Sequence, residues 1–277
     1  MKRILFPTDF SEAATNAFGH ALAFAKKIQG ELILLHSYPV LPMDDQFFPE
    51  NFNMVYDTVE LTEFDMFKEE VPKLHTLATA CNLDKIRMTH RLMEGDLIEN
   101  IQKSVTEDKV DFVVMGTAGV TDWDAVFVGS NSGDVIIEIA VPVLCVPLGA
   151  KYKPIKTIGF TTRYRDKDKK AISTVLDFAR LINASVKCLY VKTSDSDVSI
   201  ATIEEWKMEF IREPIEFFVV ESEDSNTAVV DFIGDKNINV LTMLTYKRGF
   251  FKGLFQPSYT KKKHPEFQIP ILAIHID

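Results

Sequence analysis

The chain repeats both its opening and its ending, and this repeat constrains the fold more than any other feature. The opening KRILFPTDF aligns with IKTIGFTTRY near the middle, which pairs Phe6 with Phe160 at an offset of 154 residues. The ending IPILAIH aligns with the internal VPVLCVP, which pairs Pro142 with Pro270 at an offset of 128 residues. Matching starts and ends indicate two copies of one domain. The predicted domains are 1–148 and 155–277.

The order of apolar segments in the first copy predicts an α/β domain. A short apolar strand, Ile4 to Phe6, precedes a segment in which apolar residues recur at helical spacing from Ser11 to Gly30. A second apolar strand follows, Glu31 to His36. A strand, a helix and another strand in this order imply parallel strands, so we expect a parallel sheet.

The next segments of the first copy account for its greater length. Residues Pro39 to Tyr56 carry three prolines and four aromatic residues, and we expect a loop that packs on the first domain or acts as a lid. A long amphipathic helix is predicted from about Thr58 to Cys81, and Pro72 is expected to kink or split it. Alternating polarity from Ile86 to Leu92 predicts an edge strand.

A glycine-containing loop follows the next apolar strand. In VVMGTAGVTDWDAVFVGSNS, residues 113–132, Gly116 ends the strand, and Gly119, Gly129 and Ser130 precede the apolar-periodic DVIIEIA. Glycine allows backbone to approach a ligand closely, and the unpaired N–H groups at a helix start can bind phosphate oxygens. The order therefore predicts an anion-binding loop, although glycines in such loops often serve turns alone. Neither a Walker A loop nor G-x-G-x-x-G is present.

The spacing G-x2-G-x9-G-S, in Gly116, Gly119, Gly129 and Ser130, resembles the nucleotide-binding motif of the universal stress protein family. The opening MKRILFPTDFSEAATNAF resembles the first strand and helix of that family, and the resemblance covers nearly the whole chain. It implies two tandem Rossmann-like domains of the adenine nucleotide alpha hydrolase type, each with a five-stranded parallel sheet of order 3-2-1-4-5. It also implies binding of ATP or AMP and a role in stress response or signalling.

In such a sheet the ligand lies beyond the carboxyl ends of the strands, where the strand order reverses. This places the strand that ends at Thr8 and Asp9 beside the strand that ends at Gly116. The resemblance implies that Asp9 contacts ribose or adenine; alternatively, Asp9 caps the first helix. Asn131 departs from the small apolar residue often found there in the family. The predicted nucleotide contacts are Pro7, Thr8, Asp9, Ser37, Met115, Gly116, Gly119, Gly129, Ser130, Asn131 and Ser132.

The residue types in the glycine loop favour a binding module over an enzyme. A hydrolase or kinase needs positive charge on the γ-phosphate and a placed base. No Lys or Arg lies between Gly116 and Ser132, and Asp122 and Asp124 are negative. Two alternatives stay open: a weak ATPase or self-phosphorylating enzyme, and an assembly protein that binds no nucleotide. Bound ATP is expected to need Mg²⁺ or Mn²⁺.

The second copy lacks most of the motif. The two offsets place Leu244 at Gly116 and Arg163 at Asp9, while Lys247 and Pro257 replace the other glycines. We therefore expect one nucleotide per chain, bound by the first copy. Both final strands are almost wholly apolar, which exposed sheet edges rarely are. We expect them to cover each other in an intramolecular pseudo-dimer; a further homodimer and a signalling partner stay open.

Composition excludes several classes of function. A net charge of −9 over 277 residues provides no basic field, so nucleic acid is not an expected partner. No apolar run approaches the roughly 18 residues of a membrane span, and Cys81, Cys145 and Cys188 lie far apart. We expect buried free thiols in a soluble, cytoplasmic protein.

The histidines predict no catalytic or metal site. His36 lies on a predicted buried strand and is interpreted as a satisfied core residue. The spacing of His20, His75 and His90 matches no metal motif, so no metal ligands are predicted.

Overall fold

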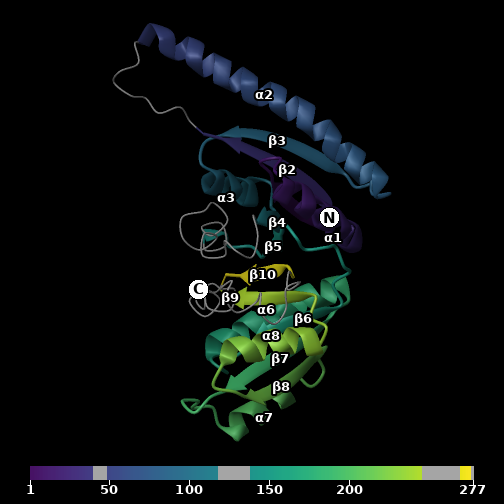
Figure 1. Ribbon diagram of the computed structural model, residues 1–277, viewed down its shortest axis with the longest axis vertical. Helices are drawn as coiled ribbons and strands as arrows, with labels where there is room; N and C mark the ends of the chain where they lie inside the picture. Colours follow the sequence, from purple (N-terminus) through teal and green to yellow (C-terminus); the bar gives the residue numbers. More distant parts are fainter. Residues whose placement is uncertain (40–48, 118–137, 245–268, 276–277) are drawn as a thin grey trace. The chain divides into compact units, whose positions relative to one another are not determined.

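The computed structural model describes residues 1–39, 49–117, 138–244 and 269–275 (Figure 1). The chain divides into two compact units, Met1–Gly116 and Thr117–Asp277. These bounds differ from the predicted repeats. Strand β5 (Val143–Pro147), which ends the first predicted repeat, pairs antiparallel with β10 (Ile271–Ile274), which ends the second. Because of this pairing, β5 belongs to the second unit.

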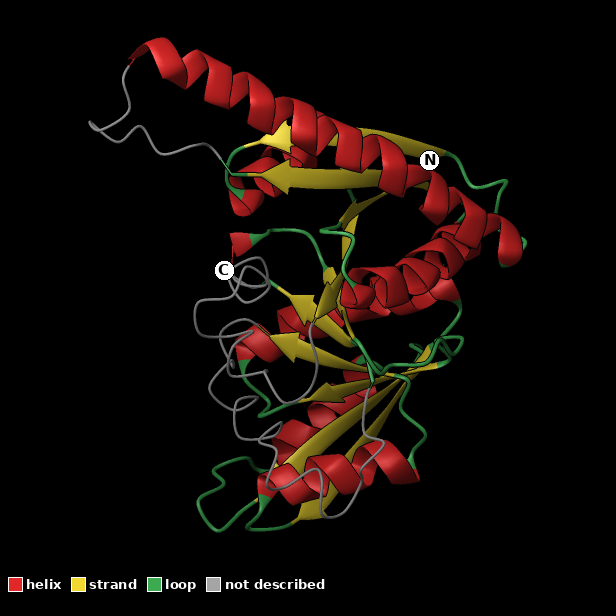
Figure 2. Ribbon diagram, turned by 45° about the horizontal axis from the view of Figure 1, so that its top comes forward, coloured by secondary structure: helices red, strands yellow, loops and turns green. Residues whose placement is uncertain are grey.

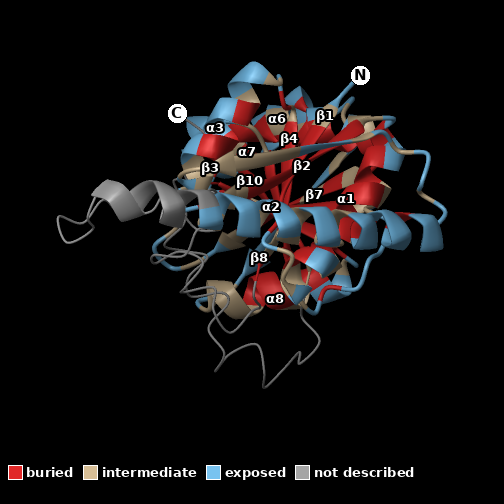
Figure 3. Ribbon diagram, turned by 90° about the horizontal axis from the view of Figure 1, so that it is seen from above, coloured by how far each residue is buried: buried red, intermediate tan, exposed pale blue. Residues whose placement is uncertain are grey.

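The first unit has parallel strands in the order β3-β2-β1-β4. These four strands follow the predicted 3-2-1-4 order, with the reversal between β1 and β4. The interiors of β1, β2 and β4 are buried, as Figure 3 shows, and β3 is the predicted edge strand. The strands are β1 (Arg3–Pro7), β2 (Glu31–Tyr38), β3 (Met88–Glu94) and β4 (Phe112–Thr117).

Helices α1 (Glu12–Ile28), α2 (Pro49–Ala80) and α3 (Leu97–Glu107) connect these strands. Right-handed crossovers place α1 and α2 on one face of the sheet and α3 on the other, and α1 contacts α2. The N-cap of α1 is Ser11, whose side chain accepts from the Ala14 N–H, and the N-cap of α3 is Asp96. Alanines fill much of the buried face of α1, so this helix packs close to the strands.

Helix α2 corrects two predictions. It begins at Pro49, so the second part of the expected Pro39–Tyr56 loop is helical. Proline suits the first position of a helix because the N–H group it lacks has no intrahelical partner there. Pro72 lies inside α2 without dividing it. Beyond Thr58 most of α2 is exposed, as Figure 3 shows, while Leu74 and Ala78 are buried.

The second unit completes the predicted order, since β8-β7-β6-β9-β10 corresponds to 3-2-1-4-5 with every pair parallel. Helices lie against these strands (Figure 2), so the α/β fold expected from the sequence is confirmed. The strands are β6 (Thr157–Thr161), β7 (Ser185–Lys192), β8 (Ile215–Glu221) and β9 (Val240–Leu244); the helices are α6 (Asp166–Ile182), α7 (Ile200–Glu209) and α8 (Ser225–Asp235).

The first strand and helix of each repeat share local geometry at the predicted offset of 154 residues. The Thr8 N–H donates to the Leu35 carbonyl at 2.8 Å, and the Thr162 N–H donates to the Leu189 carbonyl at 2.9 Å. Two residues after these threonines, Phe10 and Tyr164 have φ of 58° and 56°. The helices α1 and α6 both end at a residue with φ of 53°. The sequence repeat is therefore also a structural repeat in these segments.

The three cysteines differ in exposure. Cys145 and Cys188 are fully buried, and burial raises the pKa of Cys145 to about 12, so its thiol stays protonated and unreactive. Cys81 is exposed, which corrects the expectation of three buried thiols; it follows the end of α2, where the apolar face has ended. None of the helices in the described residues combines the length and hydrophobicity of a membrane span.

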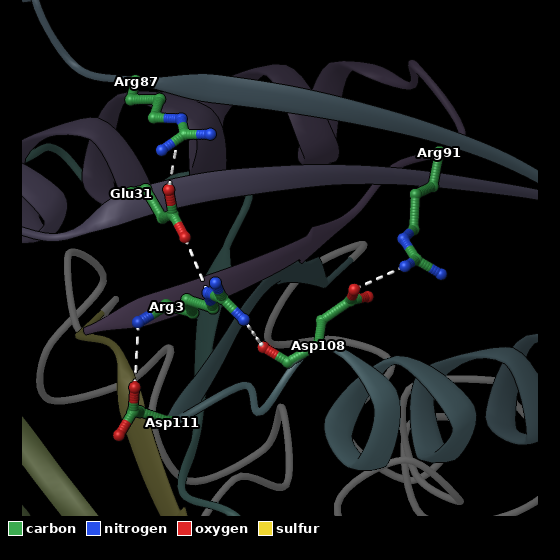
Figure 4. Close-up of polar contacts among 6 residues, drawn as sticks. All are labelled: Arg3, Glu31, Arg87, Arg91, Asp108 and Asp111. Atoms are coloured by element: carbon green, nitrogen blue, oxygen red, sulfur yellow. Dashed lines mark hydrogen bonds and ion pairs between the residues drawn. The ribbon is translucent and has the colours of Figure 1, made fainter. Parts of the chain in front are cut away.

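Charged residues join the amino ends of the strands in the first unit (Figure 4). Glu31, at the start of β2, accepts a hydrogen bond from Arg3 Nε at 2.6 Å and pairs with Arg87 Nε at 3.4 Å. Arg3 also donates to the backbone carbonyl of Asp108, and its own N–H donates to Asp111 at 2.9 Å. The Glu31 side chain is only 8% exposed, so these partners replace the water contacts that its carboxylate loses on burial.

We expect Glu31→Gln to lower the free energy of unfolding by about 2 kcal/mol, because two cations lose a nearly buried carboxylate. Urea unfolding followed by circular dichroism measures the change. The matched control is Glu221→Gln, which breaks a pair with Lys192 whose side chains are 77% and 51% exposed. That control should leave the free energy of unfolding close to the parental value, because water screens an exposed pair. Equal costs for the two variants would contradict the role given to Glu31.

Candidate functional site

The loop between β1 and α1 carries the predicted acidic residue. Thr8 is buried, and its Oγ1 accepts from the Phe10 N–H at 3.0 Å. Phe10 has a positive φ, which turns the chain sharply after Asp9. Asp9 Oδ1 accepts from the Ser11 N–H at 3.0 Å. The loop is therefore held by its own side chains, with an exposed Asp9 at its centre.

The geometry of the loop shows that Asp9 is not the N-cap of α1. Ser11, not Asp9, caps α1, because its Oγ accepts from the Ala14 N–H at 3.2 Å. Asp9 closes the preceding turn through one oxygen. Its other oxygen, Oδ2, makes no hydrogen bond or ion pair with the described residues. A carboxylate oxygen is thus available at the carboxyl end of β1.

His36, near the end of β2, supports the same loop from beneath. Its Nδ1 lies 2.7 Å from the Thr8 carbonyl oxygen, so Nδ1 carries the proton and donates. Its Nε2 lies 3.3 Å from Glu63 Oε2 on α2, and its ring lies against Phe10 and Phe67. The prediction of a satisfied core histidine is confirmed. The link to Glu63 could not be predicted from the sequence.

Ser37, a predicted contact at the end of β2, is held by Asn100 of α3. The buried Asn100 Nδ2 donates to Ser37 Oγ and to the Glu94 carbonyl, both at 3.2 Å. Sequence reasoning missed Asn100. The feature that could have identified it is a polar residue at a buried position of an amphipathic helix, because an amide buried there without a partner is costly.

The absence of a side chain at Gly116, near the end of β4, has a structural reason. A Cβ at this position would lie 2.4 Å from the Ala13 carbonyl oxygen and 2.8 Å from the Ala14 nitrogen. The first turn of α1 therefore packs directly on this glycine. Its missing side chain therefore serves helix packing, a role that was not predicted from the sequence.

The remaining predicted residues divide into two groups. Pro7 and Met115 are buried within β1 and β4, so a ligand would meet their backbone and not their side chains. Leu5 lies opposite Val113, and in that register Pro7 is level with Met115. The structure thus brings the ends of these strands together at the point where strand order reverses. Gly119, Gly129, Ser130, Asn131 and Ser132 lie outside the described residues.

The end of β2 is surrounded by acidic side chains. Burial raises the pKa of Tyr38, and the neighbouring carboxylates of Glu94, Glu60 and Glu63 raise it further. A phosphate would be repelled there, whereas a neutral base would not. Among the described residues, no group of three or more His, Cys, Asp or Glu side chains could hold a metal ion.

The equivalent loop of the second repeat has opposite charge. Arg163 replaces Asp9 and is exposed. Asp168, at the position equivalent to Ala14, is fully buried and accepts from Thr162 Oγ1 at 3.0 Å and the Arg163 N–H at 2.7 Å. The Asp168 carboxylate therefore already accepts hydrogen bonds from the hydroxyl and N–H donors of this loop. Tyr190 replaces His36, and its ring packs against Tyr164.

The chain is thus a doubly wound α/β protein made of two Rossmann-like repeats, with a polar loop where the strand order of the first repeat reverses. The sequence model of the universal stress protein family matches residues 1–147. Because this match covers more than half of the chain, the protein belongs to the universal stress protein family.

Comparisons with individual proteins agree. A universal stress protein of Methanocaldococcus jannaschii is 28% identical over 155 residues, covering 52% of this chain and 94% of that protein. One of Thermus aquaticus is 29% identical over 148 residues, covering 52% and 98%. The crystal structure of a universal stress protein from Archaeoglobus fulgidus matches 99% of this chain and 98% of that chain, with a TM-score of 0.70 at 16% identity. At that identity the structural match supports the fold alone.

Proposed function

We propose that the first repeat binds an adenine nucleotide, ATP or AMP, at the carboxyl ends of β1 and β4. The observation that carries this proposal is the exposed Asp9 carboxylate, which uses one oxygen for its turn and keeps Oδ2 for a ligand hydroxyl. The loop around it is fixed by the Thr8, Ser11 and His36 contacts. A fixed acceptor beside a strand-order reversal is what recognition of a ribose requires.

The charges around the site orient the nucleotide in this proposal. The base lies near Pro7, Thr8 and Ser37, because the acidic side chains around Tyr38 disfavour phosphate there. Asp9 accepts from the ribose hydroxyls. The phosphates then extend over the backbone at Gly116 toward Gly119 and the segment 129–132, where the family motif places its phosphate contacts.

The proposed role is that of a binding protein in stress response or signalling, in which the bound nucleotide changes the state of the chain. The enzyme alternative, slow ATP hydrolysis or self-phosphorylation, would need a base and a cation near the γ-phosphate. Calorimetric titration of the full chain with ATP and with AMP tests the proposal, and a phosphate-release assay tests the alternative. Saturable binding without phosphate release is expected. Absence of heat and of any thermal shift with both nucleotides would overturn it.

We also expect triphosphate binding to depend on a divalent cation. ATP brings about four negative charges to a loop that has no Lys or Arg between Gly116 and Ser132 and carries two aspartates. Mg²⁺ or Mn²⁺ would supply the missing positive charge. Removal of the metal with EDTA should weaken ATP binding by roughly tenfold and leave AMP binding nearly unchanged. Equal ATP affinity in both conditions would contradict this expectation.

The second repeat is proposed to be a structural partner in an intramolecular pseudo-dimer. The antiparallel register that places Leu272 opposite Leu144 supports this proposal, because each apolar final strand gains hydrogen bonds that an exposed edge would lack. The Arg163 and Asp168 geometry supports the absence of an equivalent nucleotide site in this repeat. The domain boundaries at 148 and 155 belong to the same proposal.

A further inference from the structure

Two histidines meet on the exposed side of the first unit, away from the β1–α1 loop contacts. His75 lies on α2 and His90 on β3. Their Nε2 atoms are 3.0 Å apart, and their ring centroids are 5.1 Å apart. Both residues are exposed. The two Nε2 atoms therefore face each other in a position that solvent can reach.

The packing of α2 on the sheet fixes this pair. His90 is opposite Leu34 in the register of β2 and β3, so it lies on the same face as His36, two residues further along β2. Helix α2 crosses that face, because Phe67 contacts the rings of both His36 and His90. His75 lies about two helical turns after Phe67, on the same side of α2, and this places it over His90. The pair is held by a helix and a strand and not by loops.

We propose that His75 and His90 form a binding site for one divalent transition-metal ion of tetragonal preference, Cu²⁺ or Ni²⁺. Metal–imidazole bonds of about 2.0–2.1 Å and an Nε2–Nε2 separation of 3.0 Å give an N–metal–N angle of about 94°. That angle suits the right-angled positions of a square-planar or octahedral ion. A tetrahedral Zn²⁺ would require the nitrogens to be about 3.3 Å apart.

The 3.0 Å contact between the two rings indicates how their protons are arranged. Without metal, one Nε2–H donates to the other Nε2 across the 3.0 Å separation. Metal binding requires that the donor ring carry its proton on Nδ1 instead, a change of tautomer that releases no net proton. Both Nε2 lone pairs are then available to bind the ion.

Water supplies the other ligands, because no group of three metal-binding side chains exists in the described part of the chain. The ion would fasten α2 to β3. Helix α2 also carries Glu63, the partner of His36 beneath the β1–α1 loop. Holding α2 against β3 would therefore keep Glu63 next to His36. Metal binding by this pair does not depend on nucleotide binding.

The test is equilibrium dialysis of the full chain, without a histidine tag, against Cu²⁺, Ni²⁺ and Zn²⁺ in a non-chelating buffer. We expect one Cu²⁺ or Ni²⁺ per chain, with Zn²⁺ bound more weakly than Ni²⁺. His75→Ala and His90→Ala should each weaken binding by about 100-fold, because either variant leaves a single ligand. Electron paramagnetic resonance of the Cu²⁺ form should show coupling to two imidazole nitrogens in the parent chain and to fewer in each variant.

Cys81→Ser is the matched control, because it removes an exposed thiol that could bind the same metals. It should keep the full stoichiometry and the two-nitrogen signal. Metal should also raise the thermal unfolding midpoint of the parent chain and of Cys81→Ser but not of the histidine variants. Unchanged binding in both histidine variants, loss of binding in Cys81→Ser, or Zn²⁺ bound more tightly than Ni²⁺ would overturn the proposal.

Discussion

Gly116→Ala is expected to lower the free energy of unfolding by about 3 kcal/mol, the upper part of the usual range for overpacking. The added Cβ would lie 2.4 Å from the carbonyl oxygen and 2.5 Å from the carbonyl carbon of Ala13. These are backbone atoms in the first turn of α1, which cannot rotate away as a side chain does. Either α1 or the end of β4 must shift. Urea unfolding of the full chain, followed by circular dichroism, measures the loss.

Gly19→Ala provides the control for this variant. Gly19 lies inside α1, and a Cβ there would meet nothing within 4 Å. Alanine is the better helix former, so this change should raise stability by about 0.5–1 kcal/mol. Opposite signs for the two glycines are the expected result. A neutral Gly116→Ala would show that the contact between β4 and α1 is looser than described. Because the variant perturbs folding, Gly116 is a poor position at which to test ligand binding.

Asp9→Asn is expected to reduce nucleotide affinity on the order of 10- to 100-fold while leaving stability nearly unchanged. Asparagine keeps an oxygen that can accept from the Ser11 N–H, as Asp9 Oδ1 does at 3.0 Å. It replaces the other oxygen with an NH₂ donor, which cannot accept from a ribose hydroxyl. The variant thus separates the turn from the ligand contact. Calorimetry with AMP and a thermal melt without ligand give the two readouts.

Arg163→Ala is the matched control at the equivalent position of the second repeat. Arg163 is exposed, and its backbone N–H, not its side chain, donates to Asp168. Affinity should therefore stay at the parental value. The same titrations should show one nucleotide per chain. Two nucleotides per chain, or equal losses in Asp9→Asn and Arg163→Ala, would contradict the assignment of the site to the first repeat.

Much of the architecture could be predicted because it depends on local pattern and on repetition. Apolar periodicity located β1, α1 and β2, and the match of Phe6 with Phe160 revealed the repeat that the structure shows in paired turns. Helix boundaries were less predictable. The start of α2 at Pro49 was missed, because the prolines and aromatic residues of that segment are typical of a loop. Proline is nevertheless compatible with the first position of a helix, where a backbone N–H group is not needed.

The candidate site could be predicted only in part. The sequence identified Asp9 and Ser37 from the carboxyl ends of two strands, since that location follows from strand order. It placed the start of α1 at Ser11, which the structure confirms, but left Asp9 as an alternative cap, because Asp and Ser are equally good caps and backbone geometry decides between them. It also missed Asn100, whose partner Ser37 is 63 residues away.

By itself, then, the sequence determined the parallel α/β class, the duplicated strand–helix units and the family resemblance, because these follow from patterns along the chain. The tertiary structure decided which distant residues meet. Gly116 lies under Ala13 because α1 packs on the end of β4, and His75 reaches His90 because α2 crosses the face of β3. Fifteen residues separate those histidines in sequence, and no spacing rule foretells a contact that helix packing and strand register create together.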